Sequence, residues 1–228
     1  MNTIRVMAGA LITLTLVAIP GAGKDWRPAQ GPLSTQWTDQ VTPDNAWREY
    51  PRPQLTRPEW VNLNGLWQYA IVDKDSDQPQ TWAGDILVPF AAESALSGVR
   101  KAVSPEQRLW YRREFESPEL TGGQRLLLHF GAVDWQCTVW VNGQQVGQHT
   151  GGYDPFSIDI TAAVQTGGNE LIVAVWDPTD TGYQPKGKQV LKPQGIMYTA
   201  VTGIWQTVWL ETVPRNYIES LVIVPNVD

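Results

Sequence analysis

The sequence predicts an all-β protein with the architecture of a jelly-roll β-sandwich, and three observations support that prediction. Twenty glycines and seventeen prolines in 228 residues place turns at short intervals along the chain. Between these turns lie short apolar segments with the length and spacing of strands. Apolar residues at helical spacing are almost absent. The twelve tryptophans are expected to lie mostly in the core, because burying one removes a large area from water.

The first 23 residues are predicted to be an export signal. Residues 1–5 carry one positive charge, residues 6–19 are apolar, and residues 20–23 are small, which is the order typical of a cleavable signal peptide. The apolar run is shorter than the roughly 20 residues that span a membrane. An uncleaved N-terminal anchor is the alternative. The signal predicts a secreted or periplasmic protein that has no membrane attachment once the signal is removed.

Residues 24–57 are predicted to form a proline-rich leader that extends across the surface of the fold. Six prolines between residues 28 and 58 interrupt any regular element. Trp26, Trp37 and Trp47 are the side chains expected to attach this leader to the fold. The sole cysteine, Cys137, lies in a predicted strand, so the fold must rest on packing and not on an intramolecular disulfide.

The sandwich itself is expected over residues 58–214. Strands are predicted at residues 66–72, 86–88, 110–115, 125–130, 136–141, 170–176 and 204–211. Asn142 and Gly143 predict a type I′ hairpin turn, because both residues tolerate a positive φ. Residues 170–176 are apolar on both faces, which predicts a central strand. A last strand at residues 217–224, after Pro214, is predicted to begin a second β-sandwich domain over residues 215–228.

Neither a catalytic group, a metal site nor a cofactor is predicted in this chain. Two histidines are too few for a typical zinc site. Asp73, Asp75 and Asp77 resemble the opening of a calcium loop, but Gln78 takes the place of its glycine and Gly84 takes the twelfth position. We interpret that run as a solvated turn. The net charge of −6 argues against a nucleic-acid partner, which would favour a basic surface.

Six short motifs follow one another from residue 62 onward: NLNGLW at 62–67, LVPF at 87–90, WYRREF at 110–115, VWVNG at 139–143, GGYDPF at 151–156 and GIW at 203–205. Each motif alone is weak, and their order and spacing give the group its specificity. Together they resemble the N-terminal sugar-binding domain of glycoside hydrolase family 2, the β-galactosidase and β-glucuronidase group. The resemblance implies a galactose-binding-like jelly roll, then an immunoglobulin-like domain from near Tyr217 and a (β/α)₈ barrel beyond it.

The same resemblance implies that the catalytic glutamates lie on that barrel, outside this chain. A retaining glycosidase needs two carboxyl groups about 5–5.5 Å apart, and the family's acid/base glutamate follows an asparagine. Asn169 and Glu170 match that pair of letters, but they follow two glycines and begin a predicted strand. We interpret them as part of a hairpin turn, and the chain alone is predicted to be non-catalytic.

A long segment between two predicted strands, residues 177–202, has little strand pattern. Loops of that length inside a domain are usually functional or disordered. By resemblance, family members use this loop to reach the mouth of the active site. β-Galactosidases place an aspartate shortly before the Gly-Ile-aromatic triplet, and residues 196–200 of this chain lack one, which argues against plain β-galactosidase specificity. The predicted sugar contacts of the loop are Asp177, Asp180, Tyr183, Lys186 and Tyr198.

Four more candidate sugar contacts lie earlier in the chain. Arg112 falls near a family asparagine that reaches the sugar, and its guanidinium suits an acidic sugar such as a uronate; a surface ion pair is the alternative. Trp135, next to Asp134, is either a stacking platform or a core residue. Tyr153 belongs to a turn whose glycines predict the close approach of another backbone, with ligand binding and domain contact as equal alternatives.

Three functions follow from these features. The first is an accessory domain of a secreted family 2 hydrolase, with carbohydrate as ligand and the immunoglobulin-like and barrel domains of the same polypeptide as partners. The second is a stand-alone, non-catalytic carbohydrate-binding module. The third is a cell-surface domain whose loops bind protein.

Overall fold

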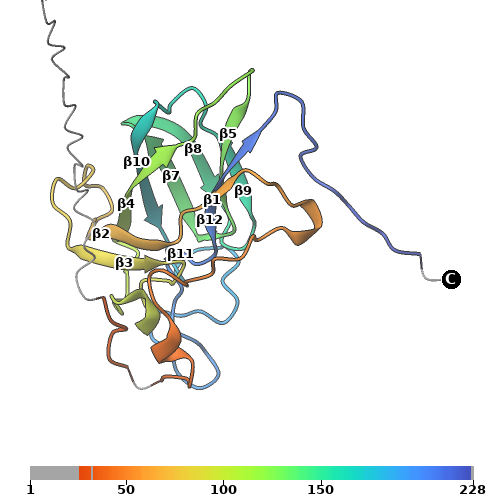
Figure 1. Cartoon of the computed structure of the whole chain (residues 1–228). Coiled ribbons are helices and arrows are strands. Elements are labelled where there is room, and N and C mark those ends of the chain that lie inside the picture. The colour runs from red at the N-terminus through yellow and green to blue at the C-terminus, as the bar shows by residue number, and fades with distance from the viewer. Residues whose placement is uncertain (1–25, 32, 227–228) are drawn as a thin grey trace, which may run out of the picture.

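The computed structural model describes residues 26–31 and 33–226, which fold as the predicted β-sandwich (Figure 1). The predicted signal peptide, residues 1–23, lies outside the described residues. No helix in the described ranges is long and apolar enough to cross a membrane.

Two antiparallel sheets form the sandwich, one of four strands in the order β1-β12-β5-β9 and one of six in the order β3-β2-β4-β10-β7-β8; a short pair, β6 and β11, adds a third, two-stranded sheet. The strand bounds are β1 Trp60–Asn62, β2 Gly65–Asp73, β3 Gly84–Val88, β4 Gln107–Ser117, β5 Arg125–Phe130, β6 Val133–Asp134, β7 Gln136–Val141, β8 Gln144–Thr150, β9 Phe156–Asp159, β10 Gly167–Trp176, β11 Gly203–Ile204 and β12 Val208–Val213. The described helices are three single 3₁₀ turns, at Thr38–Gln40, Pro53–Leu55 and Ala95–Ser97.

Most of the predicted strands are confirmed. β5 and β7 have the predicted bounds, and Asn142 and Gly143 turn between β7 and β8 with φ of 51° and 78°, as a type I′ turn requires. β10 is central, between β4 and β7. The predicted strand 204–211 is instead divided into β11, which pairs with β6, and β12, which pairs with β5.

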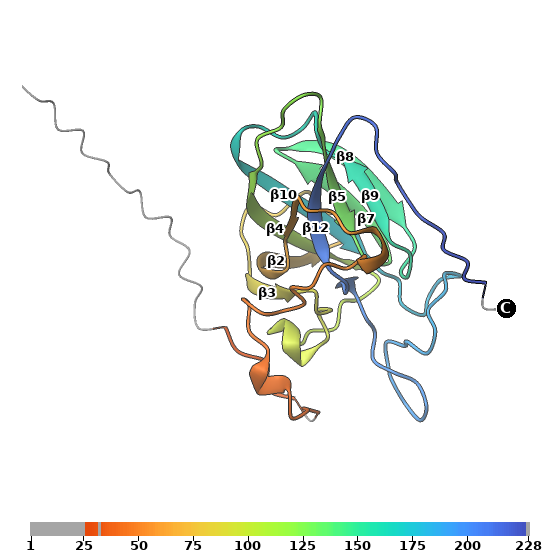
Figure 2. The ribbon, with the colours of Figure 1, turned by 45° about the vertical axis from the view of Figure 1, so that its right-hand side comes forward.

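The strand predicted at residues 217–224 is wrong for the structure of this chain. Residues 217–226 are irregular and belong to neither sheet (Figures 1 and 2). Tyr217 and Glu219 line a cavity with residues of β5 and β9. Ile218, Val222, Ile223 and Val224 are exposed there by 60%, 90%, 68% and 83%. A strand needs a neighbour to pair its N–H and C=O groups, and no described segment pairs with this one.

The core lies between the two large sheets, and β10 shows how it is built. Leu171, Val173 and Val175 point into this core and are fully buried. Ile172 and Ala174 alternate with them and pack on the outer face of the six-stranded sheet, in a second apolar cluster. Because both faces of β10 are covered, its sequence is apolar at successive positions.

The prediction that most tryptophans form the core is wrong. The structure describes all twelve, and three of them, Trp67, Trp110 and Trp209, are fully buried. Seven are half-buried, and Trp37 and Trp47 in the leader are 59% and 63% exposed. Short β-strands present mainly leucine, isoleucine and valine to the core, because these side chains fit the pleated inner surface.

Polar and charged side chains, and not the exposed Trp37 and Trp47, attach the leader to the sandwich. Glu211 on β12 is fully buried and accepts hydrogen bonds from Tyr50 Oη (2.7 Å), Arg52 Nη2 (2.5 Å) and Arg57 Nε (2.7 Å). Burial alone would raise the pKa of Glu211, but His129, Tyr50 and Arg52 hold it well below its usual value. The leader therefore ends in a buried ion-pair network.

Candidate functional site

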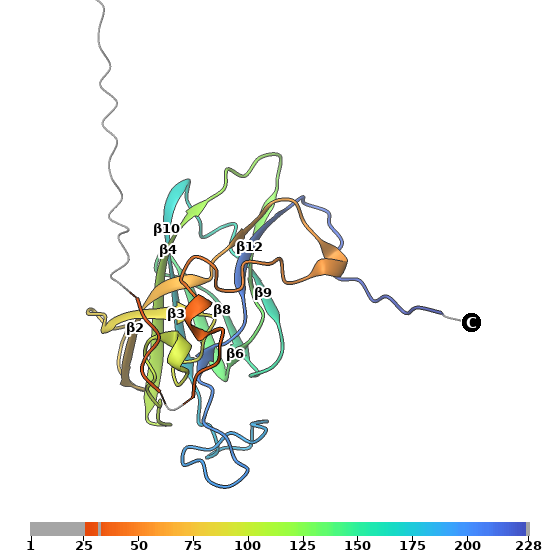
Figure 3. The same cartoon turned by 60° about the horizontal axis from the view of Figure 1, so that its bottom comes forward.

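Residues 177–202 form the long irregular loop that the sequence predicts, and it projects from one end of the sandwich (Figure 3). Its two ends meet at the buried Asp177, whose carboxylate accepts from the Thr179 N–H at 2.7 Å and the Thr202 hydroxyl at 3.2 Å. The Thr202 N–H donates to Glu93 Oε2 at 2.9 Å. Both ends of the loop are therefore held by carboxylates.

Gln189 attaches the middle of the loop to the sandwich. Its Nε2 donates to Asp134 Oδ2 at 2.9 Å and to the Tyr153 hydroxyl at 3.3 Å. Its Oε1 accepts from the Val201 N–H at 2.6 Å. One side chain thus contacts the end of β6, the turn after β8 and the returning arm of its own loop, and it brings together two predicted site residues.

Tyr153 supplies the exposed aromatic surface beside Gln189. Its side chain is 46% exposed, and its ring meets the ring of Trp205 edge to face, with centroids 6.2 Å apart. Trp205 Nε1 donates to the Gly152 carbonyl at 2.8 Å, which fixes the turn that carries Tyr153. We call Asp134, Gly152, Tyr153, Gln189 and Trp205 the loop-end site.

Gly152 is required because Asp134 comes very close to it. A Cβ at this position would lie 2.4 Å from Asp134 Oδ1, closer than non-bonded atoms allow. The sequence predicts the approach of another backbone at these glycines, and the group that approaches Gly152 is instead a side-chain carboxylate. A glycine therefore lets the turn close over Asp134.

Burial raises the pKa values of two carboxyl groups around the loop toward neutral pH. It raises the pKa of Asp134 to about 6, helped by the charge of Asp177 and opposed by the hydrogen bond from Gln189. It raises the pKa of Glu93 to about 7, against hydrogen bonds from Thr202. Glu93 Oε1 is buried and has no hydrogen-bond partner among the described residues. A negative charge on this oxygen would be poorly stabilised, which agrees with the raised pKa.

The other predicted loop residues lie outside the loop-end site. Asp180 and Lys186 are half-buried, Tyr183 is fully exposed and Tyr198 is 65% exposed. The Lys188 ammonium lies 5.6 Å from the centre of the Tyr198 ring. A cavity of about 460 Å³ on this loop is lined by Asp180, Val190, Leu191, Lys192, Gln194 and Met197.

Asp177 and Trp135 take structural positions at the base of the site. Asp177 is 2% exposed, and its oxygens bind the ends of the loop. Trp135 is half-buried, so its exposure lies between that of a stacking platform and that of a core residue. Its carbonyl accepts from the Gly151 N–H at 3.1 Å. Trp135 therefore supports the turn of Tyr153 through its backbone.

Arg112 does not join the loop-end site. Arg112 pairs with Ile172 of β10. Trp176, four residues further along β10, pairs with Gln136, which is next to Trp135. Four residues of strand span about 13 Å, so Arg112 lies about that far along the sheet from the loop-end site. Its guanidinium binds Glu170 Oε2 at 2.5 Å and Gln68 Oε1 at 2.8 Å. The alternative of a surface ion pair therefore describes its position.

Three residues of this region were not predicted as site residues: Glu93, Gln189 and Trp205. Trp205 carries a signal, because it is the aromatic member of the Gly-Ile-aromatic triplet. Glu93 and Gln189 carry none, since each acts through a contact with a residue far away in the chain. Gln189 lies 55 residues from the Asp134 that it binds.

Comparison with known proteins places residues 60–214 in a family. The family model described as "Glycosyl hydrolases family 2, sugar binding domain" matches residues 60–214. The β-glucuronidase of Felis catus is 30% identical over 213 residues, covering 78% of this chain and 32% of the relative. The β-galactosidase of Thermoanaerobacter pseudethanolicus is 32% identical over 117 residues, covering 50% of this chain and 15% of the relative.

Solved structures show the same relationship. The β-glucuronidase of Faecalibacterium prausnitzii matches with a TM-score of 0.56 and 29% identity, over 78% of this chain and 35% of that chain. The chain thus spans about a third or less of the length of these relatives. Sequence pattern, fold and relatives agree: the chain belongs to glycosyl hydrolase family 2, and residues 60–214 are its sugar-binding domain.

Proposed function

We propose that this chain is the N-terminal accessory domain of a secreted family 2 enzyme that hydrolyses β-glycosides with retention of configuration. In this proposal an immunoglobulin-like domain and a catalytic barrel of the same polypeptide supply the chemistry. The loop-end site lies at the entrance to the catalytic centre and contacts the sugar there. The greater length of the relatives, which are β-glucuronidases and a β-galactosidase, supports this reading.

The loop-end site is the observation that carries the proposal. An exposed tyrosine ring is held on edge by Trp205, beside an amide and a buried carboxylate that already share a hydrogen bond. Apolar surface with a few fixed polar groups is the usual composition of a small-molecule site. The Tyr153 ring would pack against a sugar face, and the Tyr153 hydroxyl and Gln189 amide would hydrogen-bond its hydroxyl groups.

The geometry also explains why these groups are held in place before a sugar arrives. Gln189 is bound at both ends of its amide, and Gly152 packs directly on Asp134. Fixed groups lose little entropy on binding, so they orient a substrate efficiently. In the proposal this chain positions the sugar, and the barrel cleaves it.

The first experiment is hydrolysis of chromogenic β-glucuronides and β-galactosides by the longer protein, meaning the polypeptide with the proposed immunoglobulin-like and barrel domains. It is measured with and without Tyr153→Ala. We expect hydrolysis of at least one of them, and a KM raised about tenfold by the substitution, because packing on the sugar is lost. The matched control is Trp37→Ala, which removes an aromatic ring of similar exposure from the leader. A longer protein that cleaves neither substrate would contradict the enzymatic proposal.

A stand-alone carbohydrate-binding module is the second candidate, favoured by the exposed ring of Tyr153. The test is sugar binding by residues 24–228 alone. Binding that Tyr153→Ala abolishes, together with an inactive longer protein, would select the module. Failure of both tests would leave the cell-surface interaction domain.

Secretion is part of the proposal and rests on the first 23 residues. We expect the mature protein in the medium or periplasm to begin near residue 24, as N-terminal sequencing would establish. Its intact mass should lie well above the 25.4 kDa of this chain if the missing domains belong to the same polypeptide. A mass slightly below that value would favour the stand-alone module.

A further inference from the structure

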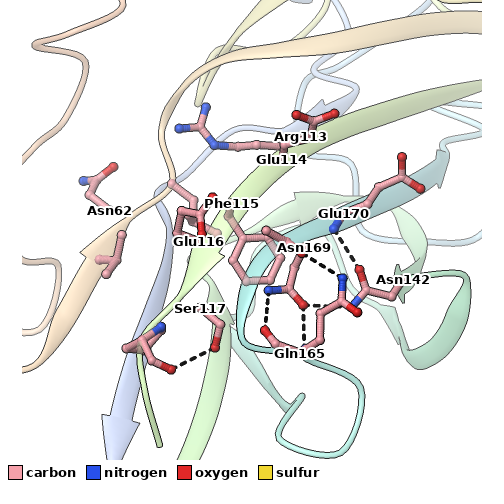
Figure 4. Close-up of a pocket in the computed structure, with 14 residues that line it drawn as sticks. Asn62, Arg113, Glu114, Phe115, Glu116, Ser117, Asn142, Gln165, Asn169 and Glu170 are labelled. Carbon is pink, nitrogen blue, oxygen red and sulfur yellow. Dashed lines mark hydrogen bonds between the residues drawn. The ribbon is translucent and has the colours of Figure 1, made fainter. Parts of the chain in front are cut away.

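A groove of about 790 Å³ opens where the first strand of the small sheet faces the large sheet (Figure 4). Val61 and Leu63 line one side, and Phe115 and Ser117 of β4 line the other. A second cavity of about 400 Å³ shares Val61 and Pro118 with the first and continues past Trp60 to Pro58. The two cavities together follow β1 over its whole length, and we call them the β1 groove.

Both walls of the β1 groove have free strand edges. β1 is the last strand of the four-stranded sheet and pairs with β12 alone. On the opposite wall, β4 pairs with β2 from Gln107 to Arg112, and no described strand continues that pairing along Arg113 to Ser117. In an antiparallel ladder every second residue turns its N–H and C=O toward the next strand. Each wall therefore directs unpaired backbone groups along the groove.

Free edges of this kind are templates for another strand. Proteins usually protect an exposed edge, because an extended segment can pair with it. Here the floor between the edges is apolar: Leu63 and Phe115 are buried, and Val61 is 43% exposed. An added strand would place alternate side chains on this floor and the others at the rim.

The rim of the β1 groove is acidic. Five glutamates and one arginine, Arg113, are the charged residues that line the two cavities; the glutamates are Glu59, Glu114, Glu116, Glu119 and Glu170. Arg113 is turned inward, because it donates to the Leu66 carbonyl at 2.9 Å and lies 5.9 Å from the Trp67 ring. Within the described residues, Glu59, Glu116 and Glu119 form no ion pair.

We propose that the β1 groove is a docking site for an extended basic polypeptide segment, which adds to the free edge of β1 as a further strand. Backbone hydrogen bonds to β1 supply affinity, and apolar side chains at alternate positions pack on Val61 and Phe115. Lysine or arginine at the other positions pairs with Glu116 and Glu119 at the rim. The acidic rim selects a basic segment and excludes an acidic one.

The test is binding of a defined peptide to the whole chain. The probe is a heptapeptide of alternating lysine and valine with blocked ends. Two controls accompany it: the same peptide with glutamate for lysine, and the lysine peptide with alternate backbone nitrogens methylated. Calorimetry gives the affinity, and amide hydrogen exchange shows which strand is protected.

We expect the lysine peptide to bind and to slow exchange of the β1 amides, while both control peptides bind at least about tenfold more weakly. The double variant Glu116→Lys, Glu119→Lys should weaken the lysine peptide about tenfold or more. The matched control is Glu106→Lys, an exposed glutamate outside the groove, which should leave the affinity unchanged.

Three results would overturn the proposal. One is equal affinity for the methylated peptide, which would mean that charge alone holds it. Another is equal weakening by Glu106→Lys, which would mean that the overall charge of −6 is responsible. The third is protection of the β1 amides by a neutral oligosaccharide and not by the lysine peptide, which would make the groove a sugar site.

Discussion

Glu211 shows how one side chain carries more of the structure than its sequence context suggests. It lies at the end of a predicted strand, where an exposed carboxylate is common, yet it is fully buried. Arg52 and Arg57 donate to it from the leader, and Trp209 donates from its own strand at 2.7 Å. A buried charge is tolerated only when partners satisfy it in this way.

Replacing Glu211→Gln is therefore expected to lower the free energy of unfolding by about 3 kcal/mol, because two arginines lose their counter-charge in a mostly buried network. Urea unfolding measures this change. The matched control is Glu219→Gln on the exposed segment after β12, which should change stability by less than about 0.5 kcal/mol. Equal effects from the two substitutions would contradict the assigned role of Glu211.

Glu93 is expected to make the stability of the protein depend on pH. Its folded pKa of about 7 lies above the value of about 4.3 expected when unfolded. The folded state therefore binds more protons between these values. The stabilising contribution is fully present below the unfolded pKa and is lost as the pH rises through the folded pKa.

We expect Glu93→Gln to flatten the loss of stability between about pH 5 and pH 8, because glutamine cannot ionise. Urea midpoints of both proteins at each pH give the difference. His129, whose lowered pKa acts in the opposite sense, is common to both proteins and cancels in that difference. Parallel curves for the two proteins would show that Glu93 does not titrate in this range.

At the scale of elements, the loop of residues 177–202 is joined to the sandwich at separate points. Its ends are held by Asp177 and Glu93, and its middle is held by Gln189 on Asp134. Such a segment can open locally without unfolding the sheets, since few of its groups are part of the core. The middle contact is therefore the one that sets the position of the loop.

Gln189→Ala is expected to speed tryptic cleavage at Lys186 and Lys188, since the loop loses its middle attachment. The free energy of unfolding of the whole domain should fall by only about 1–3 kcal/mol, because Asp134 loses one hydrogen-bond donor. The control is Gln194→Ala, which removes an exposed amide from the same loop. Unchanged cleavage in Gln189→Ala would contradict the role of this contact.

At the scale of the molecule, the leader is part of the folded domain. Asn62 Nδ2 of β1 donates to the Trp47 carbonyl at 2.8 Å, and Asn64 Nδ2 donates to the same carbonyl at 2.9 Å. Together with the bonds to Glu211, these contacts run from the leader to β12 and to the residues before β2. Extended segments without regular structure are normally ordered only when tied down in this way.

Removing residues 24–57 is therefore expected to destabilise the sandwich by several kcal/mol, about as much as breaking a buried ion-pair network. The comparison is urea unfolding of residues 24–228 and 58–228. In the shorter chain Glu211→Gln should cost less than in the longer one, because its partners are gone. Equal costs in both chains would show that the leader does not stabilise Glu211.

The amino-acid sequence by itself determined the strands whose signals are local. Alternating or doubly apolar runs placed β5, β7 and β10, and Asn142 with Gly143 fixed the hairpin between β7 and β8, because periodicity and turn chemistry are properties of neighbouring residues. The ordered motifs also identified the family. The long loop was found by the lack of any pattern between two strands.

The tertiary structure alone decided what depends on distant partners. Gln189 became part of the site only through Asp134, and the charge of Glu211 is compensated by Arg52 of the leader. Residues 217–226 have the composition of a strand and form none, because no described strand pairs with them in this chain. Pairing, burial and charge compensation are set by residues that the fold brings together, so the sequence around any one of them does not contain the answer.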